Sequence, residues 1–137
     1  GPAPPVPASV ETKLTIRLIY AALLGAGLGK ERSFAKHSAG VRTMALVAMG
    51  ASAYTVCSAY GFANFGHYDP GRMASNVASG VGFVGAGVIT TSASRNQSVV
   101  HGLTTAATIW LSAAVGVACG VGLFRIATTA AVATVTI

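Results

Sequence analysis

Acidic residues are scarce in this chain, and their positions limit the chemistry that it could perform. The 137 residues include three acids, Glu11, Glu31 and Asp69, which lie far apart in the sequence. Acid–base catalysis and two-metal sites both need carboxylates held close together. We therefore expect no catalytic residues, no firm metal site and no enzyme activity.

A short charged segment offers the first candidate site. Glu31 and Arg32 are adjacent, and Arg42 follows after a loop. One interpretation is an ion pair at the membrane interface that fixes the hairpin between the first two helices. The other is a contact for a cation or a phosphate group at a membrane entrance. The residue types alone leave both interpretations open.

Asp69 and Arg72 form a second candidate pair with the same two interpretations. In addition, Asp69-Pro70 directly precedes an apolar run. Asp is a preferred N-cap residue, and Pro is favoured at the first helical position. This pattern predicts a helix that begins at Pro70 and is capped by Asp69.

Four uncharged polar residues lie within apolar runs: Asn76, Ser79, Thr104 and Thr105. Polar groups in lipid need hydrogen-bond partners, so we expect Asn76 and Ser79 to face the interior of a helix bundle. The four could line a polar patch inside the membrane. Alternatively, the Ser and Thr hydroxyls bond to the backbone of their own helices.

The histidines and cysteines show no ligand spacing. His37, His67 and His101 are expected near the membrane interface, and their spacing does not support a pigment or metal site. Cys57 and Cys119 lie in apolar runs and form no metal or redox motif. We interpret both cysteines as small hydrophobic residues.

The composition indicates the environment of these residues. Hydrophobic residues make up 53% of the chain and charged residues only 9%, whereas a soluble domain usually carries about 25% charged residues. So few charges cannot cover a surface that faces water, which predicts an integral protein of the lipid bilayer. The net charge is +6, and the basic residues flank apolar runs. This pattern favours membrane orientation and anionic lipid over nucleic acid.

The apolar runs predict an all-α fold, a polytopic membrane bundle of about five short transmembrane helices. Residues 1–12 are rich in Pro and Ala and are expected to form an extended arm, and residues 13–137 form the membrane domain. The last span would reach only about 22 Å, short of a hydrocarbon core of roughly 30 Å. A chain cut within this span would explain that length. The predicted spans are residues 14–29, 43–61, 73–91, 100–119 and 123–137.

Residues 69–89 are the stretch around which the other helices are expected to pack. The bulky and the small residues of this stretch form two separate stripes at helical spacing. We expect the small stripe to contact a neighbouring backbone, and the bulky stripe to meet lipid or to fill gaps. The bulky stripe comprises Met73, Val77, Val81, Val84 and Val88, and the small stripe comprises Ser75, Ser79, Gly82 and Ala86.

Glycine spacings also indicate close helix packing. Gly80–Gly85 satisfies GxGxxG, but the dinucleotide motif needs a preceding strand and an acidic residue about 20 positions later. No acid follows this segment, so we interpret its glycines as packing residues. Gly25 with Gly29, and Gly116 with Gly120, form GxxxG spacings, which let two helix backbones approach.

Basic residues cluster in the predicted loop 30–42, and this cluster predicts the orientation of the bundle. By the positive-inside rule, the loop should lie on the cytoplasmic side of a bacterial plasma membrane, or on the stromal or matrix side of an organelle membrane such as the thylakoid. The N-terminus is then outside and the C-terminus inside. The cluster comprises Lys30, Arg32, Lys36 and Arg42.

Four blocks of sequence, in this order and spacing, resemble the membrane domain of the MgtC/SapB family, the magnesium transporter-C family. The resemblance covers roughly residues 14–135, and its third block is the most specific. The blocks are RLIYAALLGAGLGKER at 17–32, AGVRTMALVAMG at 39–50, DPGRMASNVASGVGFVGAGVI at 69–89 and VHGLTTAATIW at 100–110.

The resemblance implies a small helical domain of about five spans. The better-known bacterial members of the family support survival in low magnesium, and some restrain a rotary ATP synthase or affect phosphate uptake. The resemblance therefore implies a regulator that binds other membrane proteins. This chain departs from the family at His101, where Arg is common, and it ends where many members continue into a soluble domain. The polar positions of the family fall here on Glu31, Arg32, Arg42, Asp69, Arg72, Asn76, Ser79, Thr104 and Thr105.

Two functions from different classes are compatible with these observations. In the first, the chain regulates membrane Mg²⁺ homeostasis or a partner membrane complex by helix–helix contact, without catalysis. In the second, it is a structural or assembly subunit of a larger membrane complex, such as a plastid photosystem or a respiratory complex. Mg²⁺ would be the relevant ion in the first case, and chlorophyll or lipid the relevant ligand in the second. Both functions imply other membrane subunits or self-association.

Overall fold

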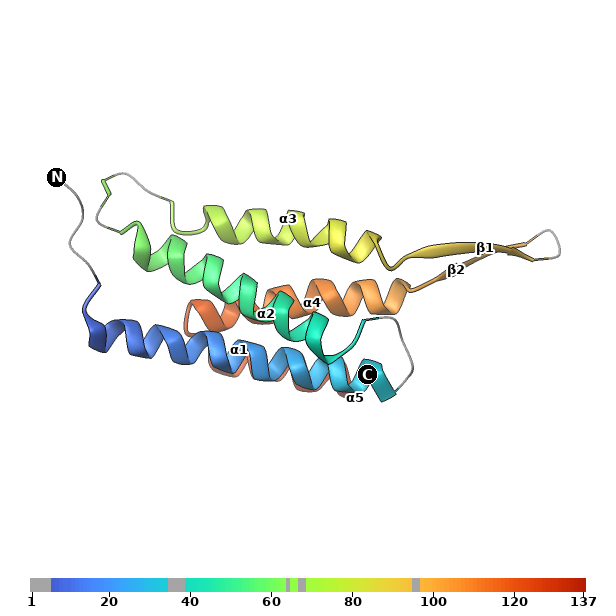
Figure 1. Cartoon of the computed structure of the whole chain (residues 1–137), viewed down its shortest axis with the longest axis horizontal. Helices are drawn as coiled ribbons and strands as arrows, with labels where there is room; N and C mark the ends of the chain where they lie inside the picture. The colour runs from blue at the N-terminus through green and yellow to red at the C-terminus, as the bar shows by residue number, and fades with distance from the viewer. Residues whose placement is uncertain (1–5, 35–38, 64, 67–68, 95–96) are drawn as a thin grey trace.

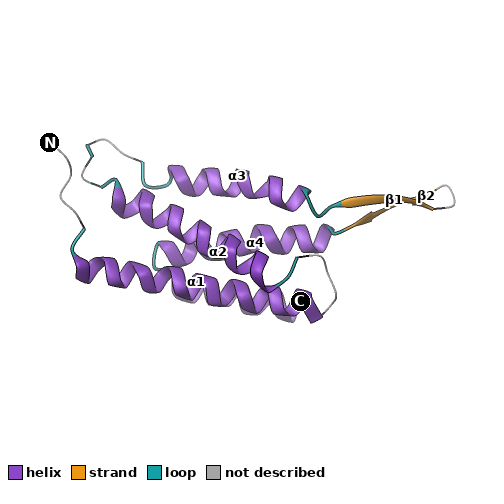
Figure 2. Cartoon of the chain, in the orientation of Figure 1, coloured by secondary structure: helices purple, strands orange, loops and turns teal. Residues whose placement is uncertain are grey.

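The computed structural model describes residues 6–34, 39–63, 65–66, 69–94 and 97–137, and most of these residues form helices that run along one long axis (Figures 1 and 2). Five α-helices lie within the described residues, as predicted. The second helix continues into a π-helical segment at Cys57–Gly61. The α-helices are α1 (Ala8–Phe34), α2 (Val41–Val56), α3 (Arg72–Ala86), α4 (Leu103–Gly120) and α5 (Phe124–Thr136).

Helix α1 is longer than the predicted first span. It begins at Ala8, so it includes residues 8–12, which the sequence predicts as part of an extended arm. The Pro7 carbonyl oxygen accepts hydrogen bonds from the N–H groups of Val10 and Glu11, and these bonds start the helix. Glu11 places a negative charge in the first turn, where the helix dipole favours it.

The GxxxG spacings of α1 and α4 lie where these helices contact α2, as the sequence predicts. A Cβ atom added to Gly25 would lie 2.5 Å from the carbonyl oxygen of Met44. One added to Gly116 would lie 2.1 Å from the carbonyl oxygen of Ala48. Because both neighbours are backbone atoms, a side chain at either glycine would push the helices apart.

Helix α5 packs against α1 and α4 through small residues and one aromatic pair. Ala127 and Ala131 are buried. The Tyr20 ring meets the Phe124 ring edge-on, with the ring centroids 5.1 Å apart. The Tyr20 hydroxyl also forms a hydrogen bond with the Thr128 hydroxyl. These contacts place α5 against α1.

The all-α prediction holds for the bundle itself, but a short β-hairpin joins α3 to α4 and corrects two predicted span boundaries. Strands β1 (Thr90–Ser94) and β2 (Gln97–His101) pair antiparallel and project beyond the helices (Figure 1). Helix α3 therefore ends at Ala86, earlier than predicted, and α4 begins at Leu103, later than predicted. The hairpin contains several β-branched Thr and Val residues, which favour an extended backbone.

The orientation of α3 is the reverse of the predicted one. Four of the five residues of the bulky stripe are buried or partly buried, whereas every residue of the small stripe is exposed. Asn76 and Ser79 are exposed as well, so the prediction that they face the bundle interior was wrong. Lipid and protein interior are both apolar, and here the bulky side chains fill the space between α3 and its neighbours. Of the GxGxxG glycines, Gly85 lies in ordinary contact with α4, its added Cβ being 3.6 Å from Ala106. A Cβ added to Gly80 or Gly82 would meet no atom within 4 Å, so interpreting these two as packing residues was wrong.

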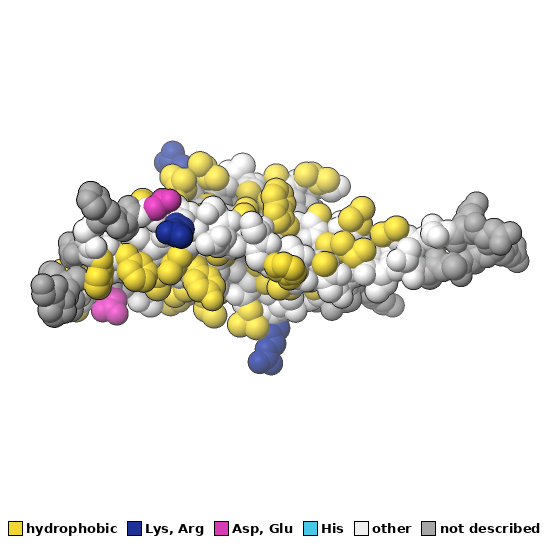
Figure 3. All heavy atoms as spheres, turned by 90° about the horizontal axis from the view of Figure 1, so that it is seen from above, with side chains coloured by type: hydrophobic (Ala, Val, Ile, Leu, Met, Phe, Trp, Pro, Cys, Tyr) yellow, Lys and Arg dark blue, Asp and Glu magenta, His cyan; other side chains and the backbone are white. Residues whose placement is uncertain are grey.

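Two helical segments, Val41–Gly61 and Leu103–Gly120, are long and apolar enough to cross a membrane. Helix α5 is apolar but shorter. Large hydrophobic side chains also cover much of the exterior, including Leu23, which is 66% exposed, and Phe83, which is 84% exposed. Figure 3 views the molecule from the side of α3 and shows hydrophobic side chains along its length, with few charged ones. This exterior agrees with a lipid environment.

Candidate functional site

Arg32 is a buried cation at the end of α1. It is 6% exposed and lies in the last helical turn, where the helix dipole favours a positive charge. Gly29, one turn earlier, lets the start of α2 approach, because a Cβ added there would lie 2.4 Å from the Cα atom of Val41. This close approach helps to enclose the end of α1, and Arg32 with it.

Two side chains lie close to the Arg32 guanidinium. Nη2 donates a hydrogen bond to Thr105 Oγ1 at 3.3 Å, and Nη1 lies 3.6 Å from Glu31 Oε2. The ion pair between Glu31 and Arg32, one of the two interpretations of this segment, is present, and Thr105 of α4 also contacts the Arg32 guanidinium. Both distances exceed the roughly 2.7–2.9 Å of a strong charge-assisted hydrogen bond.

The Arg32 guanidinium retains unused hydrogen-bonding capacity. An arginine side chain has five N–H donors. Its Nε atom is buried and has no hydrogen-bond partner among the described residues. An unsatisfied buried donor typically costs about 1–3 kcal/mol, and more when the group is charged. The site would therefore gain stability from an additional acceptor.

A cavity of about 490 Å³ opens beside Arg32, between α1, α4 and α5. Thr104 lines this cavity and is exposed, whereas Thr105 beside it is buried against Arg32. Its wall combines polar and apolar side chains. The polar residues are Glu31, Arg32, Thr104, Thr108 and Thr134, and the apolar ones include Ala107, Trp110 and Leu111.

A second arginine, which sequence reasoning did not select as a site residue, is held at the opposite end of the bundle. Arg17 Nη1 donates hydrogen bonds to the Tyr60 hydroxyl at 2.8 Å and to the Gly120 carbonyl at 3.0 Å. The guanidinium also lies 5.1 Å from the centroid of the Tyr60 ring. These partners are distant in the sequence, so no local pattern could reveal them. Gly122, with φ of +84°, lies beside Arg17 in the tight turn between α4 and α5.

Asp69 and Arg72 are both exposed before and at the start of α3. The helix begins at Arg72 with Gly71 as its N-cap and without a side-chain cap, so the predicted start at Pro70 was wrong. Asp69 Oδ1 instead accepts a hydrogen bond from the Gly71 N–H at 2.9 Å. A carboxylate that bonds two residues ahead closes a turn before the helix, which explains the shift.

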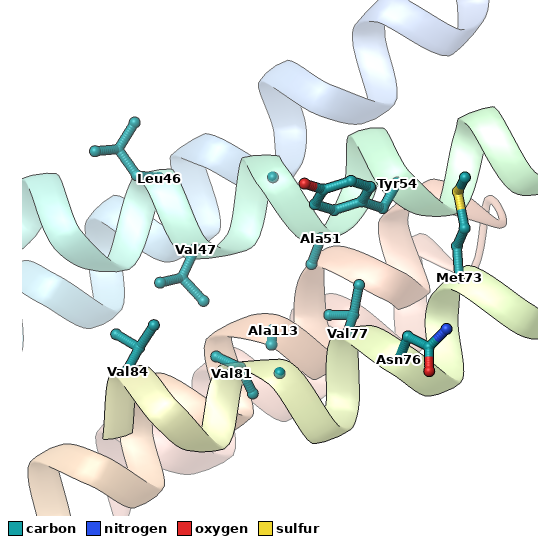
Figure 4. A pocket seen from close by; sticks show the side chains of 12 residues that line it. Leu46, Val47, Ala51, Tyr54, Met73, Asn76, Val77, Val81, Val84 and Ala113 are labelled. Atoms are coloured by element: carbon teal, nitrogen blue, oxygen red, sulfur yellow. The ribbon is translucent and has the colours of Figure 1, made fainter. Parts of the chain in front are cut away.

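Asn76 does not line the cavity beside Arg32 that Thr104 lines. It lines an open groove of about 490 Å³ between α2 and α3 (Figure 4). The other side chains of this groove are mainly apolar, among them Val47 and Tyr54 from α2 and Val77 from α3. The predicted polar patch that joins Asn76 and Ser79 to the two threonines is therefore not formed.

The structure brings together four of the nine candidate positions, Glu31, Arg32, Thr104 and Thr105. Arg42 is exposed at the start of α2 and does not line the Arg32 cavity. Sequence reasoning missed Thr108 and Trp110, which line this cavity. Thr108 lies one helical turn after Thr104, and this spacing on α4 was the available signal.

No group of three or more His, Cys, Asp or Glu residues is placed to hold a metal ion within the described ranges. His101 is exposed on β2, and His37 and His67 lie outside the described residues. Cys57 is exposed and Cys119 is buried, and neither forms a disulfide. Within the part of the chain that the structure describes, His101, Cys57 and Cys119 do not converge on one site.

Comparison with known proteins identifies the family. The sequence model of the MgtC family matches residues 18–137, which include both ends of the bundle and the Arg32 cavity. This chain belongs to the MgtC family. Membership confirms the resemblance found in the sequence, and it agrees with the apolar exterior of a membrane protein.

Curated relatives are 45–48% identical to this MgtC-family chain over the aligned residues. It is 45% identical over 116 residues to "Putative magnesium transporter YhiD" of Escherichia coli K12, covering 81% of this chain and 52% of YhiD. It is 46% identical over 110 residues to protein MgtC of Salmonella typhimurium, covering 80% and 44%. It is 48% identical over 118 residues to protein MgtC of Brucella abortus, covering 86% and 45%.

The chain spans about half the length of the curated relatives that it matches. No solved structure matches it. Residues 18–137, which match the family model, include most of the helix bundle and all residues of the Arg32 cavity.

Proposed function

We propose that this MgtC-family chain is a non-enzymatic membrane protein that regulates magnesium-linked ion homeostasis by contacting a partner membrane protein through α3. The observation that carries the proposal is the small stripe, which is exposed along the whole of α3. Small residues let membrane helices approach closely, and Ser hydroxyls can bond across such an interface. Because α3 packs on α2 and α4 with its opposite side, a partner can reach this stripe.

Asn76 supports the same proposal. Its amide is exposed on α3, where lipid can satisfy none of its donors and acceptors. Intramembrane hydrogen bonds of this kind contribute about 0.6–2 kcal/mol to helix association. A partner helix would supply the missing hydrogen bonds of Asn76.

The arrangement of the acids favours regulation by contact over passage of Mg²⁺ through this chain. Protein sites for Mg²⁺ usually provide one or two carboxylates, with water completing the octahedral shell. Glu11 and Asp69 lie at one end of the bundle, whereas Glu31 lies at the other (Figure 1). Glu31 is also paired with Arg32, whose positive charge repels a cation. The magnesium link proposed here therefore runs through the partner.

We propose that the bundle crosses the membrane with its hairpin end, the end that carries β1 and β2, on the cytoplasmic side. The helices alternate in direction along the long axis (Figure 1), which is the arrangement of five successive spans. Lys30 and Arg42 lie at the hairpin end, and the positive-inside rule places such loops on the cytoplasmic side. The start of α1 then lies outside.

Substitutions on α3 test the proposed contact. Gly82→Leu adds a large side chain to the small stripe, and Gly27→Leu on α1 is a matched control, because both glycines have open space where a Cβ would lie. We expect Gly82→Leu to reduce the partner protein that co-purifies from native membranes at least about tenfold, since steric exclusion at a helix interface costs more than about 1.4 kcal/mol. Growth of the host in low magnesium should fall in parallel. Equal loss for both variants, or loss for neither, would contradict the proposal.

A permanent structural subunit is the second candidate, because the groove between α2 and α3 could hold a fixed neighbour. Its lining is largely apolar over about 490 Å³. Native mass spectrometry of the gently solubilised particle separates the two functions. A fixed stoichiometry with every copy assembled favours the subunit, and a varying fraction of free chain favours the regulator.

A further inference from the structure

The cavity beside Arg32 has the features of a binding site for an anion. We propose that it binds a phosphate group, carried either by the headgroup of an anionic lipid or by free phosphate. The starting observation is that the Arg32 side chain is 7% exposed, while its Nε atom has no partner among the described residues. The proposal does not depend on the α3 contact, because the two sites involve different helix faces.

The charge of Arg32 favours an anion over a neutral ligand. A guanidinium is always protonated in proteins, and a buried charge is stable only when it is paired and hydrogen-bonded. Its planar fork matches the geometry of phosphate oxygens, which it can bind with two parallel N–H donors. The present partners, at 3.3 Å and 3.6 Å, leave room for stronger acceptors.

Glu31 is the group that opposes an anion in this cavity, since its carboxylate lies 3.6 Å from Arg32. The Glu31 side chain is 35% exposed, whereas that of Arg32 is 7% exposed. The Glu31 side chain can therefore turn toward water when an anion binds, whereas the Arg32 side chain stays in the cavity wall. Lys30 adds positive charge at the same end of the bundle.

The start of α4 provides a second favourable feature for an anion. Thr104 lies in the first turn of this helix and lines the cavity. N–H groups of a first helical turn lack intrahelical acceptors, and the helix dipole is positive there. The Thr108 hydroxyl already bonds to the Thr104 carbonyl, so the Thr104 hydroxyl is the better donor to a phosphate oxygen.

The rest of the cavity wall is apolar, which suits a ligand with a hydrocarbon part. Ala107, Trp110 and Leu111 continue along α4 from the polar end. A phospholipid would place its phosphate at Arg32 and an acyl chain along these residues. Free phosphate would use the polar end alone, and this difference lets one experiment distinguish the two sources.

The test uses the full chain in a mild detergent with two probes. Native mass spectrometry measures how much phosphatidylglycerol the chain retains, with phosphatidylcholine as the control lipid. Calorimetry measures the affinity for inorganic phosphate, with chloride as the control anion at the same ionic strength. We expect Arg32→Gln to weaken binding of the preferred probe about 10- to 100-fold, the range for lost hydrogen bonds to a charged group. Arg42→Gln removes the same charge outside the cavity and should change the affinity less than about twofold. Thr104→Val should weaken binding about 3- to 10-fold.

Each outcome decides the proposal or the source of the phosphate. Retention of phosphatidylglycerol without binding of inorganic phosphate supports the site and assigns the lipid headgroup. Binding of inorganic phosphate supports the site and assigns the phosphate group by itself. Binding of neither probe overturns the proposal, and so does an equal effect of Arg32→Gln and Arg42→Gln. If Arg32→Gln does not fold, unchanged binding by Thr104→Val overturns it.

Discussion

Two arginines at opposite ends of the bundle differ in how well their charges are satisfied. Arg17 has a short hydrogen bond to Tyr60, another to the end of α4 and an aromatic ring beneath its guanidinium. Arg32 has two long contacts and one buried Nε without a partner in the described residues. The sequence offers an ion pair between Arg32 and Glu31 as one of two interpretations of this charged segment. It cannot predict the contact with Thr105, since that depends on the approach of α4 to the end of α1.

Removal of the Arg17 side-chain charge should destabilise the fold. We expect Arg17→Met to lower the free energy of unfolding by about 1.5–3 kcal/mol, because the Gly120 carbonyl and the Tyr60 hydroxyl both lose a charged donor. Tyr60→Phe is the control, and it should cost less because the bond to Gly120 remains. Equilibrium unfolding in mixed micelles measures both values. An unfolding free energy of Arg17→Met equal to that of the native chain would contradict this role.

Helix spacing was more predictable than helix orientation. The apolar runs predict the helices, and the two GxxxG spacings predict close-packing faces on α1 and α4, whose neighbour in the structure is α2. The stripes of α3 also exist as predicted, but a stripe does not say which side meets lipid, because both surroundings are apolar. For residues 90–101 the sequence predicts helix ends and a loop, whereas the structure has the β1–β2 hairpin. A short run of β-branched residues is compatible with helix or strand, and only the pairing of the two strands distinguishes them.

Two glycines of α1 provide a matched test of the close packing. Gly25→Ala places a Cβ 2.5 Å from the Met44 carbonyl oxygen, whereas Gly27→Ala meets no atom within 4 Å. We expect Gly25→Ala to lower the free energy of unfolding by about 1–3 kcal/mol through overpacking. Gly27→Ala should be neutral or stabilising by up to about 1 kcal/mol, because Ala favours helix more than Gly does. If both variants change the free energy of unfolding in the same direction, contact with α2 is not the reason that glycine is needed at position 25.

At the scale of the whole molecule, three helices form a tightly packed core, and a fourth helix packs on this core with one side and is exposed on the other. Helices α1, α2 and α4 meet through glycines and buried small residues. Helix α3 covers this core with its bulky stripe and leaves its small stripe toward the surroundings. The family relation establishes an MgtC-type membrane bundle. The exposed stripe is what favours regulation through contact with a partner.

Site-specific photocrosslinking in native membranes tests the contact through α3 most directly. Benzoylphenylalanine would replace Phe83 on α3, which is 84% exposed, or Leu23 on α1, which is 66% exposed, as the control. Both positions face outward, but only Phe83 borders the small stripe. The account predicts a discrete crosslinked product from position 83 and none from position 23. Identical products from the two positions, or uncrosslinked chain from both, would contradict it.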